Sequence, residues 1–324
     1  MLNLEDYIPQ LGKSVFMQSS SIMGGGVSVF GDAWYVDADN GSDDSNGQTP
    51  STAFATISKA YESATTNNND VIFLSNAGSH TLTEMLTISK SRIAFIGADF
   101  ATRTYGQGSR INMGVTLAAT DVFAVKNTGV RNSFSGIKFS SSNTLTENVG
   151  TFGEGGEYTV FNSCEFYNSG KQASDTHAEL VLNGDSAQFN NCTIGSLATA
   201  VTGDKVRPAV LLTKATVAAG KVSRDVLFNN CRFWKNAGGT TTAMIKGGAT
   251  DVERVMEFKD CIFMANSLGS APAVAIDVAT LTVGQIITTG STCSIGCTKT
   301  STAVGVFNCT PTYVATATIG IQST

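Results

Sequence analysis

Four copies of one six-residue phrase decide how this chain folds. They are Phe161-Asn-Ser-Cys164-Glu-Phe166, Phe189-Asn-Asn-Cys192-Thr-Ile194, Phe228-Asn-Asn-Cys231-Arg-Phe233 and Phe258-Lys-Asp-Cys261-Ile-Phe263. A weaker copy, Phe134-Ser-Gly-Ile137-Lys-Phe139, has isoleucine in place of cysteine. The copies begin at residues 134, 161, 189, 228 and 258. A recurrence of roughly 20 to 50 residues is typical of solenoid proteins, in which each repeat stacks on its neighbours.

Each copy has the alternation of a β-strand. Residues two apart share one face of a strand, so Cys164 and Phe166 are predicted to point inward and Glu165 outward. A single copy cannot bury its apolar face alone, whereas a stack of copies about 4.8 Å apart can. The repeat therefore predicts an all-β, single-stranded parallel β-helix with a ladder of cysteines and aromatic rings inside.

The composition agrees with a β-rich chain. Of 324 residues, 42% are hydrophobic and 15% are charged, and the net charge is -5. The charged fraction is well below the usual quarter. A basic stripe for nucleic acid and an apolar run of about 18 residues for a membrane are both missing from the sequence. We therefore expect neither nucleic acid nor a membrane as a partner.

The chain has seven cysteines, and those of the repeat are interpreted as free, buried thiols. Four of them occupy the same inward position of the repeat, where cysteine acts as a small buried hydrophobe. With two histidines, His80 and His177, the chain lacks the usual companions for a zinc site. The first residues have no basic region followed by an apolar core, so we expect no signal peptide and folding in a reducing compartment.

A second stretch carries a family resemblance. It reads Trp34-Tyr-Val-Asp37-Ala-Asp39-Asn-Gly41-Ser-Asp43-Asp44, continues through Pro50, and ends in Ala53-Phe54-Ala-Thr56-Ile57. It resembles the entry motif of right-handed parallel β-helix proteins of the pectate-lyase-like superfamily, with Ala53 where that motif usually has proline. The resemblance covers roughly residues 33 to 270 and implies a right-handed helix. It carries no chemistry by itself.

The chain divides into three parts. Residues 1–32 form an arm that is either disordered or orders on a docking partner, 33–270 form the β-helix, and 271–324 form a β-rich cap or assembly segment. The apolar spacing from Thr56 to Ala64 predicts a short capping helix that ends at Asn67–Asn69. The long interval between the second and third phrases predicts an inserted loop around residues 198–222.

The candidate chemical residues are few, and the sequence assigns no catalytic, cofactor-binding or metal-binding residue. The acidic loop of Asp37, Asp39, Asp43 and Asp44 fits turn chemistry better than calcium. Lys205 and Arg207 are only a weak match to the Lys or Arg base of a polysaccharide lyase. His177, beside Asp175, Thr176 and Glu179, is interpreted as an exposed loop residue. Asp260 has no carboxylate at the equivalent repeat positions, as a glycosidase would need. The recurring asparagines are expected to hydrogen-bond along the axis; they are Asn162, Asn168, Asn190, Asn191, Asn229, Asn230, Asn236 and Asn266.

These observations favour a non-enzymatic structural protein. The resemblance, the missing leader, the buried thiols and the apolar arm suggest a virion protein of a tailed bacteriophage. We expect a capsid decoration, tail spike or fibre component that forms a homotrimer and docks on other virion proteins through residues 1–32. Two alternatives stay open: a polysaccharide lyase or glycoside hydrolase of the tailspike type, and a glycan-binding adhesin that uses Trp234, Tyr167 and Tyr313.

Overall fold

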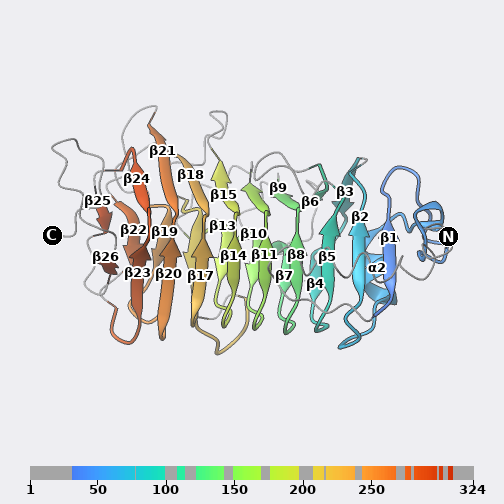
Figure 1. The fold of residues 1–324 in the computed structure, drawn as a ribbon, viewed down its shortest axis with the longest axis horizontal. Coiled ribbons are helices and arrows are strands. Elements are labelled where there is room, and N and C mark those ends of the chain that lie inside the picture. Colours follow the sequence, from blue (N-terminus) through green and yellow to red (C-terminus); the bar gives the residue numbers. More distant parts are fainter. Residues whose placement is uncertain are drawn as a thin grey trace, which may run out of the picture.

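The computed structural model describes most of the chain. The described residues are 31–76, 78–98, 108–113, 122–141, 149–168, 176–196, 207–214, 217–237, 243–267, 274–278, 281–297, 299–301 and 306–308. They form three parallel sheets, one short α-helix and one 3-10 turn (Figure 1).

The ten-stranded sheet A runs the length of the molecule. Its strands are β1 (Ala33–Val36), β2 (Val71–Leu74), β5 (Ala94–Gly97), β8 (Ser133–Ser135), β11 (Val160–Asn162), β14 (Gln188–Asn190), β17 (Val226–Asn229), β20 (Val255–Lys259), β23 (Gln285–Thr289) and β26 (Val306–Asn308). The eight-stranded sheet B contains β3 (Ser79–Leu82), β6 (Arg110–Met113), β9 (Lys138–Ser141), β12 (Glu165–Asn168), β15 (Thr193–Ser196), β18 (Arg232–Ala237), β21 (Ile262–Ser267) and β24 (Cys293–Ile295). The eight-stranded sheet C contains β4 (Leu86–Ile88), β7 (Phe123–Asn127), β10 (Gly150–Glu154), β13 (Ala178–Leu182), β16 (Val210–Leu212), β19 (Ile245–Gly247), β22 (Val274–Val278) and β25 (Lys299–Ser301).

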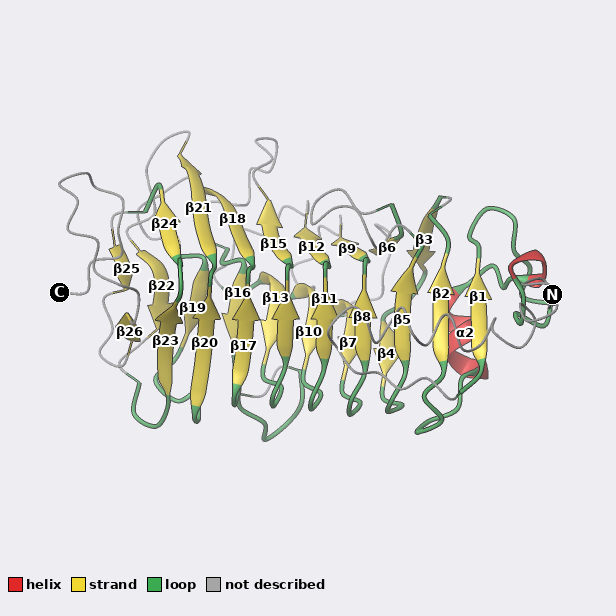
Figure 2. Ribbon diagram, in the orientation of Figure 1, coloured by secondary structure: helices red, strands yellow, loops and turns green. Residues whose placement is uncertain are grey.

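After β1, the chain visits the sheets in the fixed order A, B, C from β2 onward, so each later circuit adds one strand to each sheet. The sheet A strands lie on the near side in Figure 2, and successive circuits advance from β1 at one end to β26 at the other. This path is the predicted right-handed parallel β-helix.

The repeated phrase is two strands rather than one, which corrects the single strand predicted from its alternation. In the copy that begins at Phe161, β11 ends at Asn162 and β12 begins at Glu165. Between them, Ser163 adopts a left-handed conformation with φ of 51°. This kink turns its N–H toward the next coil, where it donates to the carbonyl of Asn190 at 2.8 Å. The hydrogen-bond ladder therefore continues around the corner between sheets A and B. The same conformation recurs at equivalent corner positions, at Gly136, Asn191, Asn230 and Asp260.

The interior contains the predicted ladders. The Phe161 and Phe189 rings stack at 4.6 Å between centroids, and Phe189 stacks on Phe228 at the same distance. Cys192 lies at the corner, fully buried, and its thiol donates to the carbonyl of Phe161 one coil earlier at 3.6 Å. Cys164, Cys231 and Cys261 repeat this arrangement as free, buried thiols. The prediction of free inward cysteines is confirmed at these four positions.

The predicted helix is α2 (Ile57–Ser63), and it packs on β1 and β2. Its N-cap is Thr56, whose side chain accepts from the N–H of Lys59. The helix ends at Ser63 with Ala64 as its C-cap, so Asn67–Asn69 do not terminate it. Ile57 and Ala60 are buried in the core, where they fill the first coil.

The three sheets extend beyond residue 270, where the sequence placed the end of the helix. Strands β22 to β26 continue all three sheets as far as Asn308. Residues 1–30 and 309–324, which hold most of the arm and the end of the tail, lie outside the described residues. None of the described helices is long and apolar enough to cross a membrane.

The long interval between Phe189 and Phe228 contains β16 and a long connection back to sheet A. Part of the predicted insertion, residues 198–206 and 215–216, lies outside the described residues. The described part brings Val217 onto sheet C, where it packs in a second apolar cluster with Phe123 and Val181. The connection therefore contributes to packing as well as to the surface.

Candidate functional site

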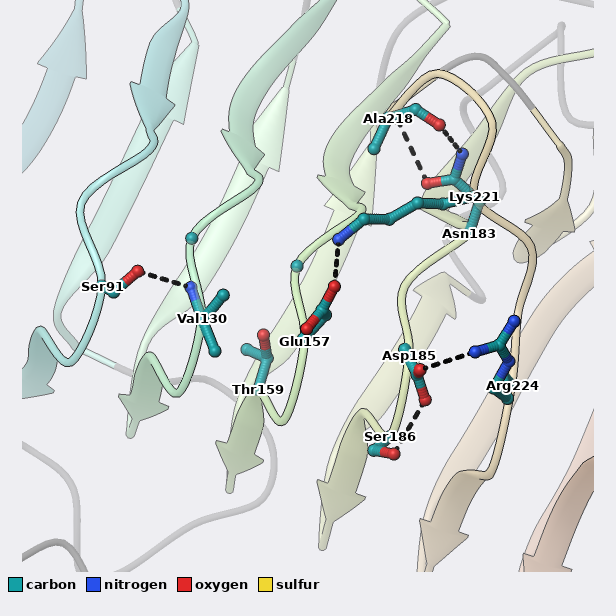
Figure 3. A network of polar contacts seen from close by, with 12 residues as sticks. Ser91, Val130, Glu157, Thr159, Asn183, Asp185, Ser186, Ala218, Lys221 and Arg224 are labelled. Carbon is teal, nitrogen blue, oxygen red and sulfur yellow. Dashed lines mark hydrogen bonds and ion pairs between the residues drawn. The ribbon is translucent and has the colours of Figure 1, made fainter.

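A group of charged side chains follows the corner where sheet C passes into sheet A. Glu157, Asp185 and Arg224 are bridge partners in successive coils, so their backbones stack along the axis. We call these residues, together with Lys221, Asp225, Glu253 and Arg254, the charged ridge. Figure 3 labels four of its members: Glu157, Asp185, Lys221 and Arg224. The ridge was missed in the sequence, although a signal was present: its stacked residues each come four positions before a repeated phenylalanine.

Ion pairs join different coils of the ridge. The Nζ atom of Lys221 lies 2.9 Å from a carboxylate oxygen of Glu157. Arg224 reaches Asp185 at 3.4 Å and also binds Glu253. The hydrogen bond from Arg224 to Glu253 raises the pKa of this guanidinium above its ordinary value. Figure 3 shows the Glu157–Lys221 and Asp185–Arg224 contacts side by side.

Glu157 and Asp185 are ridge carboxylates on adjacent coils, so they are weighed here as a catalytic pair. Glycoside hydrolysis needs one carboxyl to give a proton and another to act as base or nucleophile. Here each carboxylate is paired with its own cation, Lys221 or Arg224. Both carboxylates are therefore already engaged by side chains of the ridge itself. The arrangement suits bracing of the corner better than acid–base chemistry.

A buried polar network lies at the same corner. Glu154 is fully buried at the end of β10. Its carboxylate accepts from Nδ2 of Asn127 at 2.9 and 3.2 Å, from the hydroxyl of Thr159 at 3.0 Å and from the N–H of Gly156 at 2.8 Å. Burial raises the pKa of Glu154 to about 7, and these hydrogen bonds oppose the rise. The group is titratable near neutral pH but has no access to solvent.

A buried ion pair joins Arg207 and Glu179, which the sequence analysis considered separately. Arg207 is fully buried and binds Glu179 at 3.2 Å and the carbonyl of Asn168 at 2.9 Å. A guanidinium held in this way cannot approach a substrate as a lyase base. His177 is also largely buried, with Nδ1 lying 3.3 Å from the Thr176 hydroxyl, so the expected exposed loop histidine is wrong. Lys205 and Asp175 lie outside the described residues.

The acidic loop uses its carboxylates for turns. Asp37 Oδ1 accepts from the N–H groups of Asp39 and Asn40 at 3.0 and 3.2 Å. Asp43 accepts from the N–H groups of Ala55 and Thr56 at 2.9 Å each, just before α2. Desolvation by burial acts to raise the pKa of Asp37, but these hydrogen bonds outweigh it and lower the pKa below its ordinary value. Within the described part of the chain, no group of three or more His, Cys, Asp or Glu side chains is arranged to hold a metal ion.

The asparagines form axial ladders at the corner between sheets A and B. Asn190 donates to Asn162 at 3.2 Å, and Asn229 donates to Asn190 at 3.4 Å. A second ladder runs from Asn230 to Asn191 at 2.7 Å. The predicted role of these five residues in axial hydrogen bonding is confirmed. The side chains of Asn236 and Asn266 lie outside the description.

Two aromatic side chains named for glycan binding lie on the outer face of sheet B. Tyr167 and Trp234 follow the inward Phe166 and Phe233, and both are half-buried. The strand register places Gly195, which is paired with Trp234, between them. The ammonium of Lys138 lies 4.8 Å from the centroid of the Tyr167 ring. Tyr313 lies outside the described residues.

Comparison with known proteins identifies the fold. No protein-family model matches the sequence, and no curated protein matches it significantly. Among solved structures, pectate lyase Pel9A has a TM-score of 0.58 at 14% identity, over 82% of this chain and 64% of the lyase chain. A pectin methylesterase in complex with a hexasaccharide has a TM-score of 0.56 at 14% identity, over 88% of this chain and 90% of the esterase. The pectin methylesterase from Aspergillus niger has a TM-score of 0.52 at 15% identity, over 86% and 85%. The chain therefore has the parallel β-helix fold of pectate-lyase-like proteins, and identity at this level carries no activity with it.

Proposed function

We propose that this chain is a non-enzymatic structural protein of a tailed-phage particle. It acts as a decoration, spike or fibre component, assembles as a homotrimer, and docks on other virion proteins through residues 1–32. The observation that carries the proposal is the engagement of the charged ridge: its acids and bases bind one another along the axis, as Glu157 does Lys221 and Asp185 does Arg224.

This pattern suits a shaft that must keep its coils in register. Each ridge contact joins residues that are distant in sequence and lie in different coils, and the asparagine ladders join neighbouring coils at the next corner. The outward polar groups thereby add specificity to a stack that the inward phenylalanines hold together. The four buried free thiols fit a protein that folds in the reducing interior of a host cell before assembly.

A polysaccharide screen tests the non-enzymatic part of the proposal. The full chain is incubated with a panel of neutral and acidic polysaccharides, and both new reducing ends and unsaturated products are measured. We expect no product above that of a heat-denatured sample. Product formation that Glu157→Gln or Asp185→Asn abolishes, while the fold is retained, would overturn the proposal and make the ridge an active site.

Glycan binding without catalysis is the second candidate, and the shared outward row of Tyr167 and Trp234 favours it. Aromatic faces pack well against the apolar faces of sugars, and Gly195, between the two positions, carries no side chain. A glycan array tests it with Trp234→Ala against Leu227→Ala, a half-buried outward position of sheet A. Binding that is lost in the first variant and kept in the second would support the adhesin; absence of binding by the unaltered chain would exclude it for the glycans on the array.

A further inference from the structure

His80 is a buried histidine at the N-terminal end of the β-helix. It lies on β3, the terminal strand of sheet B at this end (Figure 2). Its side chain is only 3% exposed and points inward, in register with the buried Ile111 of β6. The same inward row continues with Phe139 on β9. A titratable side chain therefore heads a row of apolar ones.

Only one of the two ring nitrogens of His80 has a hydrogen-bond partner. Nε2 lies 3.0 Å from the carbonyl oxygen of Ser75. Because a carbonyl oxygen can only accept, Nε2 carries the hydrogen and Nδ1 is the bare nitrogen of a neutral ring. Nδ1 is buried and has no partner in the part of the chain that the structure describes. A second proton on this ring would therefore be a buried donor without an acceptor, which is unfavourable.

Two carboxylates act on the ring from the neighbouring acidic loop. Asp37 and Asp39, which follow β1, both favour the charged form of His80. The N–H of Ser75 ties this region to β1 by donating, at 2.9 Å, to the carbonyl of the residue before Asp37. On β6, the strand paired with β3, Arg110 is exposed on the outer face. Burial outweighs the carboxylates, and the pKa of His80 lies below its ordinary value.

We propose that His80 and its hydrogen bond to Ser75 form an acid-sensitive latch, the His80 latch, at the N-terminal end of the β-helix. The neutral ring fits the apolar row and ties β3 to the turn that follows β2. A proton taken from solvent at Nδ1 turns the ring into a cation that the interior does not solvate. The ring then leaves the interior for the carboxylates of Asp37 and Asp39, and its bond to Ser75 breaks. Acid thereby loosens β3 and the acidic loop while the later coils stay closed.

The direction of the effect follows from the number of protons that each state binds. Below about pH 6.5 a solvent-exposed histidine is charged, whereas the closed latch still holds His80 neutral. The open state then binds more protons, so the equilibrium constant for opening rises about tenfold for each pH unit until the buried ring also titrates. The loosened loop directly follows β1, the strand into which the proposed docking arm, residues 1–32, leads. The latch therefore makes this end of the molecule responsive to acid.

Hydrogen exchange followed by mass spectrometry tests the latch on the full chain, because it reports local opening. Protection is compared at pH 7 and pH 5, after correction for intrinsic exchange, in peptides that cover residues 37–48 and 79–82. Peptides from β20 (Val255–Lys259) are the internal control. His80→Gln keeps a donor for Ser75 and stays neutral, and His80→Phe places an apolar ring in the row. His177→Gln changes the other histidine of the chain.

We expect the unaltered chain and His177→Gln to lose protection about tenfold or more at pH 5 in the two N-terminal peptides, with no loss in β20. His80→Gln and His80→Phe should show the same protection at both pH values. Circular dichroism identifies the variants that fold, and one folded His80 variant is enough for the comparison. Protection that does not fall in the unaltered chain would overturn the latch, as would a loss that persists in a folded His80 variant. A loss of equal size in β20 would also overturn it, because opening would then be global.

Discussion

The Nδ2 group of Asn127 donates to both carboxylate oxygens of Glu154, at 2.9 and 3.2 Å, across two stacked coils inside the helix. A polar pair in this position interrupts an inward row that is otherwise apolar on either side, at Ile88 and Leu182. It makes one corner of the helix sensitive to pH.

Stability should fall as pH rises through the slightly acidic range. Burial raises the pKa of Glu154 from 4.5 to about 7, so the folded chain holds a proton that the unfolded chain has released. Between these values the folded state binds more protons, and the free energy of unfolding decreases with pH by up to about 3 kcal/mol from this group. Below about pH 4.5 and above about pH 7 its contribution is constant.

Urea unfolding at several pH values checks this with Glu154→Gln. The variant should lack the component that Glu154 contributes, so its loss of stability between pH 5 and pH 7 should be smaller than that of the unaltered chain. Glu157→Gln, which removes the exposed ion pair with Lys221, serves as the control and should follow the unaltered chain. Parallel curves for Glu154→Gln and the unaltered chain would contradict the assignment.

The asparagine ladder should contribute measurably to stability. Asn190→Ala removes the donor to Asn162 and the acceptor for Asn229, and we expect a cost of about 1 to 2 kcal/mol. Gln188→Ala is the matched control, because Gln188 is exposed on the same strand, β14; its cost should stay within about 0.5 kcal/mol. Equal midpoints of urea unfolding for the two variants would mean that the ladder is not stabilising.

A substitution at the corner between sheets C and A should raise the stability of the folded chain. Arg92 holds φ of 59°, a left-handed conformation that costs an ordinary residue about 1 to 2 kcal/mol and that asparagine adopts more readily. Arg92→Asn should therefore raise the free energy of unfolding by roughly 0.5 to 1 kcal/mol. Thermal unfolding of this variant is compared with Arg110→Asn in strand β6, for which we expect no gain. A loss in Arg92→Asn would show that its side chain has a stabilising contact that outweighs the conformation.

The thiols should separate into two classes of reactivity. Cys164, Cys192, Cys231 and Cys261 are buried, and burial raises the pKa of the Cys192 thiol well above its ordinary value. We expect iodoacetamide to leave these four unmodified in the native protein and to modify them after unfolding. Mass spectrometry of the labelled peptides measures this. Rapid native labelling of any of the four would mean that the coils open readily.

The sequence was sufficient for the fold because the repeat is itself the packing unit. Phenylalanine and cysteine recur at fixed offsets, so the spacing from Phe161 to Phe189 already determines which rings stack. The corner within the phrase was harder to predict from the sequence. Alternation is the same for one straight strand and for two strands with a kink, and Ser163 carries no strong signal for a left-handed conformation.

The polar sites depended on three-dimensional context. Glu154 lies in a run of Gly153, Gly155 and Gly156 that is typical of an exposed turn, yet the next coils cover it completely. Arg207 and Glu179 are 28 residues apart, and their buried contact forms only when the neighbouring coils stack. The ridge was predictable in principle from the residues four positions before each phenylalanine, because equal offsets in a solenoid become neighbours.

Native mass tests the central claim, a structural homotrimer, most directly. Light scattering is applied to the full chain of 33.8 kDa and to a chain lacking residues 1–32, each over a wide dilution series. The account predicts a mass three times that of one chain that persists on dilution, and retention of the trimer without the arm, which leaves the arm for docking. A monomer at all concentrations would contradict the account and favour the enzyme.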